Sequence, residues 1–164
     1  MTYLIVRRIF MDAAIQSSTS SFNLSIQKVV DQLAQHSQTV ALAFDFIPTG
    51  DFLQELNQVS VFAGAVVAPT DDAKNAMLGI PYQILNANGA KSEIAASWMA
   101  KQLRNQLKTS YGIGIVENRS KRMYWLALSD ADEVNTVPLP FRRREIDDCK
   151  AIQKAFELLS IEVK

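Results

Sequence analysis

The chain has 164 residues, which is enough for one domain with a single hydrophobic core and too few for two comfortable ones. Apolar residues make up 48% of the sequence and charged residues 21%, a composition that is typical of a folded globular protein and excludes a disordered or fibrous one. Lys plus Arg and Asp plus Glu number 17 each, so only a local patch, and not the overall charge, could attract nucleic acid or an anionic membrane.

The first ten residues, MTYLIVRRIF, contain an apolar run that is too short to span a membrane. The arginines follow this run, whereas a secretion signal carries its positive charges ahead of it. Cys149 is the only cysteine, so it forms no internal disulfide, and it falls in the apolar stripe of the last predicted helix. We therefore expect a cytoplasmic protein with Cys149 as a buried thiol and not a nucleophile.

A polar, Ser-rich stretch, SSTSSFN, divides the N-terminal run from the rest of the chain. It predicts an N-terminal extension over residues 1–22 and one domain over residues 23–164. The domain begins with apolar residues at helical spacing, which predict a helix from about 24 to 36. His36 ends this helix, and with one histidine and one cysteine we expect no metal site.

Two apolar runs follow, TVALAF at 39–44 and VFAGAVVAP at 61–69. Both are continuous and rich in β-branched residues, which is typical of strands that are covered on both faces. The segment DFLQELNQV between them has a short helical pattern.

The next two helices carry their own boundaries. In TDDAKNAMLGI, Thr70 can cap the first turn and Gly79 can end the last one. In SEIAASWMAKQLRNQLK, Ser92 is the predicted cap. The expected buried face of this long helix consists of Ile94, Trp98, Leu103 and Leu107.

Three more strands are predicted by YGIGIV, MYWLALS and TVPLPF, and Pro138 and Pro140 place the last of them at a sheet edge because proline cannot donate to a ladder. The closing helix, EIDDCKAIQKAFELL, keeps the helical period. We predict a three-layer α/β/α sandwich with a mixed sheet of about five strands, and with Trp98, Ile152 and Phe156 in its core.

The order of these segments resembles the C-terminal domain of the CinA family over roughly residues 24–162. The similarity is carried by FAGAVVAPTDDAKNAMLGI, by GAKSEIAASWMAKQLRNQLKTSYGIGIV, and by the strand pair and amphipathic helix that follow. The family is named for competence-damage-inducible proteins. Its active members are nicotinamide-nucleotide amidases, which hydrolyse nicotinamide mononucleotide to the deamidated form and ammonia.

Active members carry Glu-Ser-Cys-Thr-Gly-Gly after the first strand, with the serine as nucleophile. The matching residues here are 46–51, in the stretch FDFIPTGDF, and only Thr49 and Gly50 agree with the motif. Ile47 replaces the serine, and its side chain has no heteroatom that could attack a substrate. The resemblance therefore implies a turn that is kept and a nucleophile that is lost, with Ile47 expected in the core.

The family also has a tyrosine and a lysine around the start of the helix after the second strand. Pro69 replaces the tyrosine, whereas Lys74 matches the lysine. Because the usual partner of Lys74 is missing, we interpret Lys74 as an exposed residue of the first turn and not as a base.

The third family element is a glycine-rich loop that follows YGIGI. In this chain the loop is VENRSKR, without glycine, so backbone amides have no glycine that would let them approach a substrate closely. Arg119, Lys121 and Arg122 form a basic cluster in this loop, and a second cluster lies in FRRRE. Each is either solvated surface or an anion site.

The sequence thus predicts a CinA-like domain without amidase activity that acts as a binding, oligomerisation or regulatory module. Its vestigial site positions would be Ile47, Thr49, Gly50, Pro69 and Lys74. We expect no cofactor, a homo-oligomer, and a nucleotide-like small molecule as the ligand. Two alternatives are a surviving hydrolase that uses Thr49 or Thr70 with Lys74, and an unrelated α/β binding domain.

Overall fold

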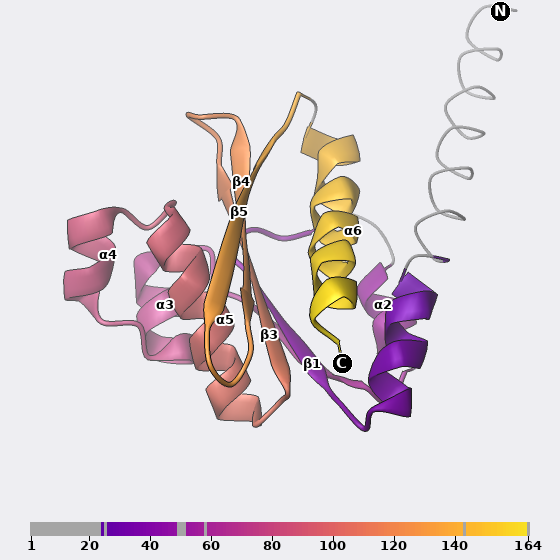
Figure 1. The fold of residues 1–164 in the computed structure, drawn as a ribbon. Coiled ribbons are helices and arrows are strands. Elements are labelled where there is room, and N and C mark those ends of the chain that lie inside the picture. Colours follow the sequence, from indigo (N-terminus) through magenta and orange to yellow (C-terminus); the bar gives the residue numbers. More distant parts are fainter. Residues whose placement is uncertain (1–23, 25, 49–51, 58, 143, 164) are drawn as a thin grey trace, which may run out of the picture.

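The computed structural model of the protein describes residues 24, 26–48, 52–57, 59–142 and 144–163 (Figure 1). The predicted N-terminal extension, residues 1–22, lies outside this range, and so do Thr49 and Gly50. No helix within the described ranges is both long enough and apolar enough to cross a membrane.

The centre of the fold is a five-stranded sheet with the order β2-β1-β3-β4-β5. Its strands are β1 (Val40–Phe44), β2 (Phe62–Val67), β3 (Tyr111–Asn118), β4 (Met123–Ser129) and β5 (Val134–Pro140). β1 pairs in parallel with β2 and β3, whereas β4 pairs antiparallel with β3 and β5. The predicted mixed sheet is confirmed, and so is the edge position of β5, where the two prolines lie.

The second apolar run differs from its prediction, because β2 is also an edge strand. Ala63 and Ala65 are exposed, whereas β1 is buried along its whole length. A continuous apolar run therefore does not by itself distinguish a central strand from an edge strand that is less completely covered.

Helices cover both faces of the sheet and make the three predicted layers (Figure 1). Helices α3 (Asp71–Leu78), α4 (Tyr82–Asn88) and α5 (Glu93–Leu107) lie on one face. The other face carries the helix at residues 26–35, α2 (Phe52–Leu56) and α6 (Arg144–Glu162). The sequence did not predict α4, a seven-residue helix in which Leu85 is the buried residue, because so short a helix leaves little periodic signal.

The predicted caps of α3 and α5 are present. Thr70 Oγ1 accepts a hydrogen bond of 3.1 Å from the backbone N–H of Ala73, and Ser92 Oγ accepts one of 3.2 Å from Ala95. Gly79 ends α3 with a φ of 65°, a left-handed conformation that glycine adopts without steric cost.

The two core layers differ in their side chains. On the α6 face, large side chains such as Phe44, Ile113 and Phe156 are buried, together with Ile152 as predicted. On the α5 face the sheet contributes small residues, among them Ala41 and Ala43. Trp98 is half-buried and packs at the border of this second layer. Cys149 is also only half-buried, and burial raises the pKa of its thiol.

The prediction of which residues form the buried face of α5 is partly wrong. Ile94 and Leu107 are 40% and 42% exposed. The residues that face the sheet are Ala95, Ala96, Met99, Ala100 and Leu103. This helix buries alanines because it lies very close to β3, where a Cβ added to Gly112 or Gly114 would come within 3.0 Å of a backbone carbonyl oxygen of α5.

This close approach predicts that Gly114→Ala destabilises the protein. The new methyl group would collide with the carbonyl oxygen of Ala96, and backbone on both sides would have to move. Overpacking of this kind costs about 1 to 3 kcal/mol. Urea unfolding would measure the cost, with Lys101→Ala on the exposed side of α5 as a control expected to change stability little. A Gly114→Ala midpoint equal to that of the control would contradict the proposed close packing.

Candidate functional site

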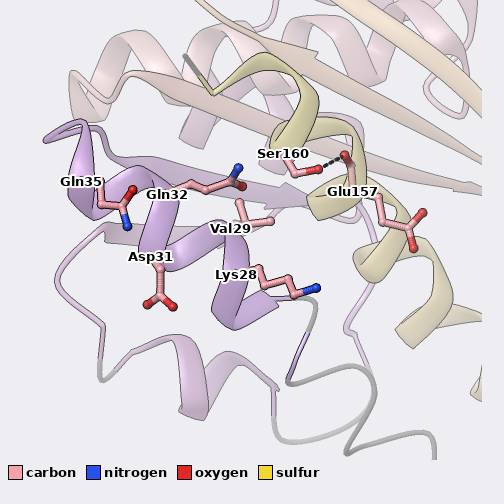
Figure 2. Close-up of a pocket in the computed structure, with 7 residues that line it drawn as sticks. All are labelled: Lys28, Val29, Asp31, Gln32, Gln35, Glu157 and Ser160. Carbon is pink, nitrogen blue, oxygen red and sulfur yellow. Dashed lines mark hydrogen bonds between the residues drawn. The ribbon is translucent and has the colours of Figure 1, made fainter.

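One cavity, of about 460 Å³, lies between the helix at residues 26–35 and α6 (Figure 2). Its lining consists of Lys28, Val29, Asp31, Gln32, Gln35, Glu157 and Ser160. The charged side chains among them are exposed to solvent. This cavity therefore lacks the buried, electrostatically perturbed groups that mark functional sites.

A second cavity, of about 620 Å³, lies at the carboxyl ends of the parallel strands β1, β2 and β3. Its lining consists of Asp45, Phe46, Ile47, Pro69, Lys91, Glu117, Asn118, Arg119 and Ser120. This edge is where ligands bind in open α/β sheets, because loops from several strands meet there. It is the candidate functional site.

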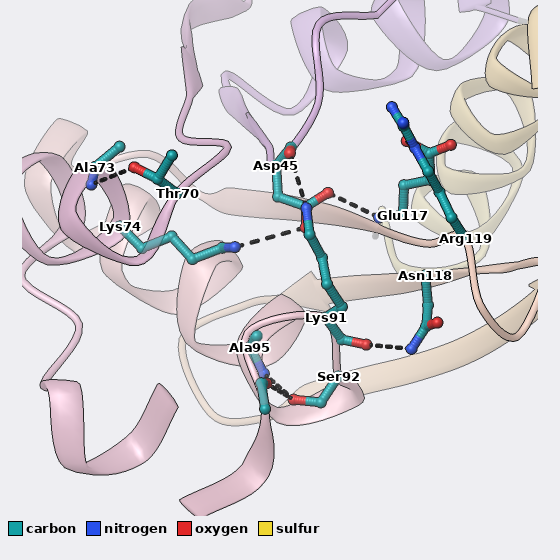
Figure 3. A network of polar contacts seen from close by, with 11 residues as sticks. Asp45, Thr70, Ala73, Lys74, Lys91, Ser92, Ala95, Glu117, Asn118 and Arg119 are labelled. Carbon is teal, nitrogen blue, oxygen red and sulfur yellow. Dashed lines mark hydrogen bonds and ion pairs between the residues drawn. The ribbon is translucent and has the colours of Figure 1, made fainter. Parts of the chain in front are cut away.

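Asp45 is the centre of the site, and its carboxylate is buried (Figure 3). Its Oδ2 lies 2.6 Å from Lys91 Nζ and 3.5 Å from Lys74 Nζ, while Oδ1 accepts a hydrogen bond of 2.7 Å from the backbone N–H of Glu117. Lys91 Nζ also donates to the backbone oxygen of Asp45, at 3.2 Å. One carboxylate thus joins the ends of β1 and β3 to α3 and to the loop before α5.

The local structure explains how these side chains meet. Asp45 directly follows β1, and its backbone N–H extends the sheet by donating to Ile115 at 3.2 Å. The cap at Thr70 starts α3 immediately after β2, so Lys74 in its first turn points toward the end of β1 (Figure 3). Lys91 precedes the cap of α5, and its backbone oxygen accepts a hydrogen bond of 2.7 Å from Asn118 Nδ2.

Lys74 is completely buried, so its interpretation as an exposed lysine is wrong. Burial lowers the pKa of its ammonium, an effect that the charge of Asp45 opposes. Burial likewise raises the pKa of the Asp45 carboxyl, and the hydrogen bond from Lys91 opposes that shift. Lys74 Nζ has no hydrogen-bond partner among the residues that the structure describes, and its 3.5 Å contact with Asp45 is a long one.

Ile47 is not part of the core. Its side chain is 74% exposed and lies at the cavity, as does Pro69. The neighbouring Phe46 is the buried residue, and its ring packs against Phe44 and Tyr124 with centroid distances of 5.8 and 5.7 Å. A hollow site therefore remains where the sequence predicted a filled one.

The basic loop after β3 contributes one residue to the cavity lining. Arg119 lines it, and its Nε lies 3.3 Å from Oε2 of the buried Glu117. Lys121 and Arg122 are exposed and lie outside the lining. The two basic clusters adjoin each other in space, because the backbone N–H of Phe141 donates to Arg122 at 2.9 Å and brings Arg142 to the same end of the sheet.

Sequence reasoning missed three residues of the site, namely Asp45, Lys91 and Glu117. Asp45 left a signal, since an acidic residue directly after a fully buried strand lies at the carboxyl edge of the sheet. Lys91 and Glu117 left none, because only the folded chain brings them to Asp45. In the described ranges no group of three or more His, Cys, Asp or Glu side chains is placed to hold a metal ion.

Comparison with known proteins confirms the predicted resemblance. Residues 23–117 match the family described as CinA C-terminal domain. A "CinA-like protein" of Anaeromyxobacter sp. (strain Fw109-5) is 35% identical over 115 residues, which cover 67% of this chain and 27% of the relative. A competence-damage inducible protein of Oceanobacillus iheyensis is 28% identical over 151 residues, covering 82% and 36%. The chain thus spans about a quarter to a third of the length of these relatives.

The fold also matches solved structures. A competence-damaged protein (CinA) superfamily protein from Klebsiella pneumoniae superimposes with a TM-score of 0.75 over 87% of this chain and 97% of that chain. The two sequences are 17% identical, so the likeness concerns the fold. An unrelated α/β architecture is thereby excluded.

The buried charges predict how variants at Asp45 behave. Asp45→Asn leaves Lys74 as an uncompensated buried cation, which costs about 3 to 5 kcal/mol of stability. Adding Lys74→Met to this variant should recover much of the loss, because the double variant buries neither charge. Lys91→Met, by contrast, should not rescue Asp45→Asn, since the Lys91 side chain is 43% exposed and keeps its hydration. Denaturant unfolding of these variants tests both expectations, and equal rescue by Lys74→Met and Lys91→Met would contradict the burial of Lys74.

The ion pair of Asp45 and Lys74 also predicts how the stability of the Asp45→Asn variant depends on pH. In Asp45→Asn the charge that opposes the effect of burial is gone, so the pKa of Lys74 in the native state falls further below the ordinary lysine pKa of 10.5. The unfolded chain holds that proton up to about 10.5, and stability therefore rises with pH in this window because the unfolded state binds more protons. We expect the stability of Asp45→Asn to rise more steeply with pH than that of the unaltered protein. Parallel stability profiles in alkaline buffers would be evidence against it.

Proposed function

Because the chain belongs to the family of CinA C-terminal domains, we propose that it is a CinA-like protein that has lost amidase activity and acts as a binding or regulatory module. The main support for this proposal is that the residues aligned with the family's serine nucleophile have no reactive atom. Aligned on Thr49 and Gly50, Ile47 replaces the serine. Aligned one residue earlier, Asp45 matches the acidic residue of the motif and Phe46 replaces the serine.

Neither alignment supplies an attacking atom. The side chains of Phe46 and Ile47 consist of carbon alone, and an amide hydrolase that works through a covalent intermediate needs an oxygen or sulfur nucleophile at this position. Ser120 is the hydroxyl residue of the cavity lining, and its Oγ donates a hydrogen bond of 2.8 Å to Asn118 Oδ1 in the loop after β3. It comes from a different strand end than the family serine.

The site could still bind a small molecule, because it has an open cavity with polar groups in its walls. Phe46, Ile47 and Pro69 offer apolar surface, whereas Lys91 and Arg119 offer cations. Apolar walls with a few convergent polar groups are typical of small-molecule sites. We propose a nucleotide-like small molecule as the ligand.

The location and assembly state are also proposals. A single, half-buried cysteine fits the reducing cytoplasm. Exposed apolar side chains such as Met77 and Tyr82, at 47% and 43% exposure, favour contact with a second copy in a homo-oligomer. Light scattering after size-exclusion chromatography would measure the assembly state.

A surviving hydrolase that uses Thr49 or Thr70 with Lys74 is the second candidate. It is favoured by the burial of Lys74, which lowers the pKa of the ammonium as a general base requires. The position of Thr70 is evidence against a hydrolase that uses this residue, because Thr70 Oγ1 caps α3 and Thr70 lies outside the cavity lining. Thr49 lies outside the described residues.

An activity assay separates the two candidates. We expect no ammonia release from nicotinamide mononucleotide above a mock-purified control, because loss of a covalent nucleophile costs several orders of magnitude in rate. A family member with the complete Glu-Ser-Cys-Thr-Gly-Gly motif serves as the positive control. Turnover that is abolished by Lys74→Ala, together with Thr49→Ala or Thr70→Ala, would instead establish the hydrolase.

Restoring the serine tests whether the rest of the machinery survives. Ile47→Ser should not restore amidase activity, because Pro69 still replaces the tyrosine and the glycine-rich loop is still absent, and groups that act as a unit fail together. Because Ile47 is 74% exposed, the substitution should change the stability by less than about 0.5 kcal/mol. Ammonia release by the folded variant would contradict the first expectation, and a large shift of its urea midpoint the second.

A further inference from the structure

Arg119 is held at the mouth of the cavity by a chain of buried contacts. Lys91 and Lys74 flank the Asp45 carboxylate, Asp45 accepts the backbone N–H of Glu117, and the Glu117 carboxylate contacts Arg119 (Figure 3). Glu117 is only 2% exposed, so its carboxylate is a fixed anchor and not a mobile surface group. The contact with Glu117 favours one orientation of the guanidinium before a ligand binds.

Most donors of Arg119 are still available. A guanidinium carries five N–H donors, and within the described part of the chain only Nε of Arg119 has a partner, at 3.3 Å. The side chain is 69% exposed and lines the cavity, so the remaining donors are accessible to solvent. Two parallel N–H donors on a planar group match the oxygens of a phosphate.

The loop that carries Arg119 is rigidly connected. Asn118 Oδ1 accepts hydrogen bonds from Ser120 Oγ at 2.8 Å and from the backbone N–H of Lys121 at 3.1 Å, while its Nδ2 donates to the backbone oxygen of Lys91 at 2.7 Å. One amide side chain thus fixes the hairpin turn and attaches it to the opposite wall of the cavity. The distance between the two cationic walls is set by this contact.

Further cationic side chains lie near Arg119, on the turn between β3 and β4 and after β5. Lys121 and Arg122 form no ion pair with any carboxylate in the described ranges, and both are exposed. The contact between Phe141 and Arg122 adds the exposed Arg142 to this end of the sheet. Clustered cations around a cleft raise the local concentration of anions and speed their association.

We infer that Arg119 binds the phosphate group of a small molecule whose remaining part lies in the cavity against Phe46, Ile47 and Pro69, with Glu117 as the residue that positions Arg119. Lys121, Arg122 and Arg142 steer the anion toward the cavity without making the decisive contact. This inference rests on the proposed binding function and adds to it the group that is recognised. Lys91 does not take this role, because Asp45 engages its ammonium through both a carboxylate and a backbone oxygen.

Two probes that differ only in phosphate test the inference, namely nicotinamide mononucleotide and nicotinamide riboside. We expect calorimetry on the full chain to show that the phosphate strengthens binding by about ten- to a hundredfold, the range of a hydrogen bond to a charged group. Arg119→Gln should remove this advantage, so that both probes bind equally, while Lys101→Gln on α5 should keep it. Glu117→Gln should reduce it without abolishing it, because the amide oxygen of Gln can still accept a hydrogen bond from Arg119 but carries no negative charge to hold it.

The steering residues have a different signature. Arg122→Gln and Arg142→Gln should lower the association rate and its dependence on salt, with a smaller effect on the dissociation rate than Arg119→Gln has. In an NMR titration, inorganic phosphate alone should shift the Nε signal of Arg119. A short oligothymidylate tests nucleic acid as the source of the phosphate, and we expect it not to displace the mononucleotide.

Several results would overturn the inference. One is equal affinity of the unaltered protein for the two probes. Another is that neither probe binds and inorganic phosphate leaves the NMR signal of Arg119 unchanged. A third is that the phosphate still strengthens binding in Arg119→Gln. Binding of the oligonucleotide in preference to the mononucleotide would reject the small molecule. None of these outcomes depends on ammonia release, so the loss of amidase activity stands or falls separately.

Discussion

The closeness of helix α5 to strand β3 is the constraint on which the rest of the structure depends. At Gly112 and Gly114 the backbone of α5 occupies the space that a side chain on β3 would need. The residues of α5 at these contacts, Ala96 and Ala100, are small as well. This contact brings the first turn of α5, and the loop with Lys91 ahead of it, over the ends of β1 and β3 (Figure 3). Larger residues in this layer would lift the helix and pull Lys91 away from Asp45, so the packing of small residues on one face determines the geometry of the site at the sheet edge.

At that edge a single buried carboxylate organises the charges. Two lysines and a backbone N–H converge on Asp45, and the same strand end holds Glu117 against Arg119. Burying charges is costly unless each is paired and hydrogen-bonded, and Lys74, with one long contact, satisfies this condition poorly. Such a costly arrangement contributes little to stability. Buried charges with perturbed pKa values beside a cavity are typical of functional sites.

The fold of the chain matches that of its family, and the proposed loss of activity concerns only the residues at the sheet edge. The strand ends, the cap of α3 and the lysine in its first turn are all in place. Ile47 stands at the position that resembles the family serine, and the short turn between β3 and β4 has three cations and no glycine. This turn presents guanidinium and ammonium groups to solvent. Such groups fit the proposed recognition of an anionic group.

The sequence by itself determined all the strands, most of the helices, the caps of α3 and α5, and the edge position of β5. These features are local, because a cap or a proline acts within a few residues of itself. Only the tertiary structure decided which face of α5 is buried, that Lys74 lies inside and Ile47 outside, and that Asp45, Lys91 and Glu117 meet. Those outcomes depend on contacts between residues as far apart as 45 and 117. The periodicity of a sequence does not encode such contacts. They form when parallel strands align their carboxyl ends, and when Gly112 and Gly114 allow α5 to pack closely against the sheet.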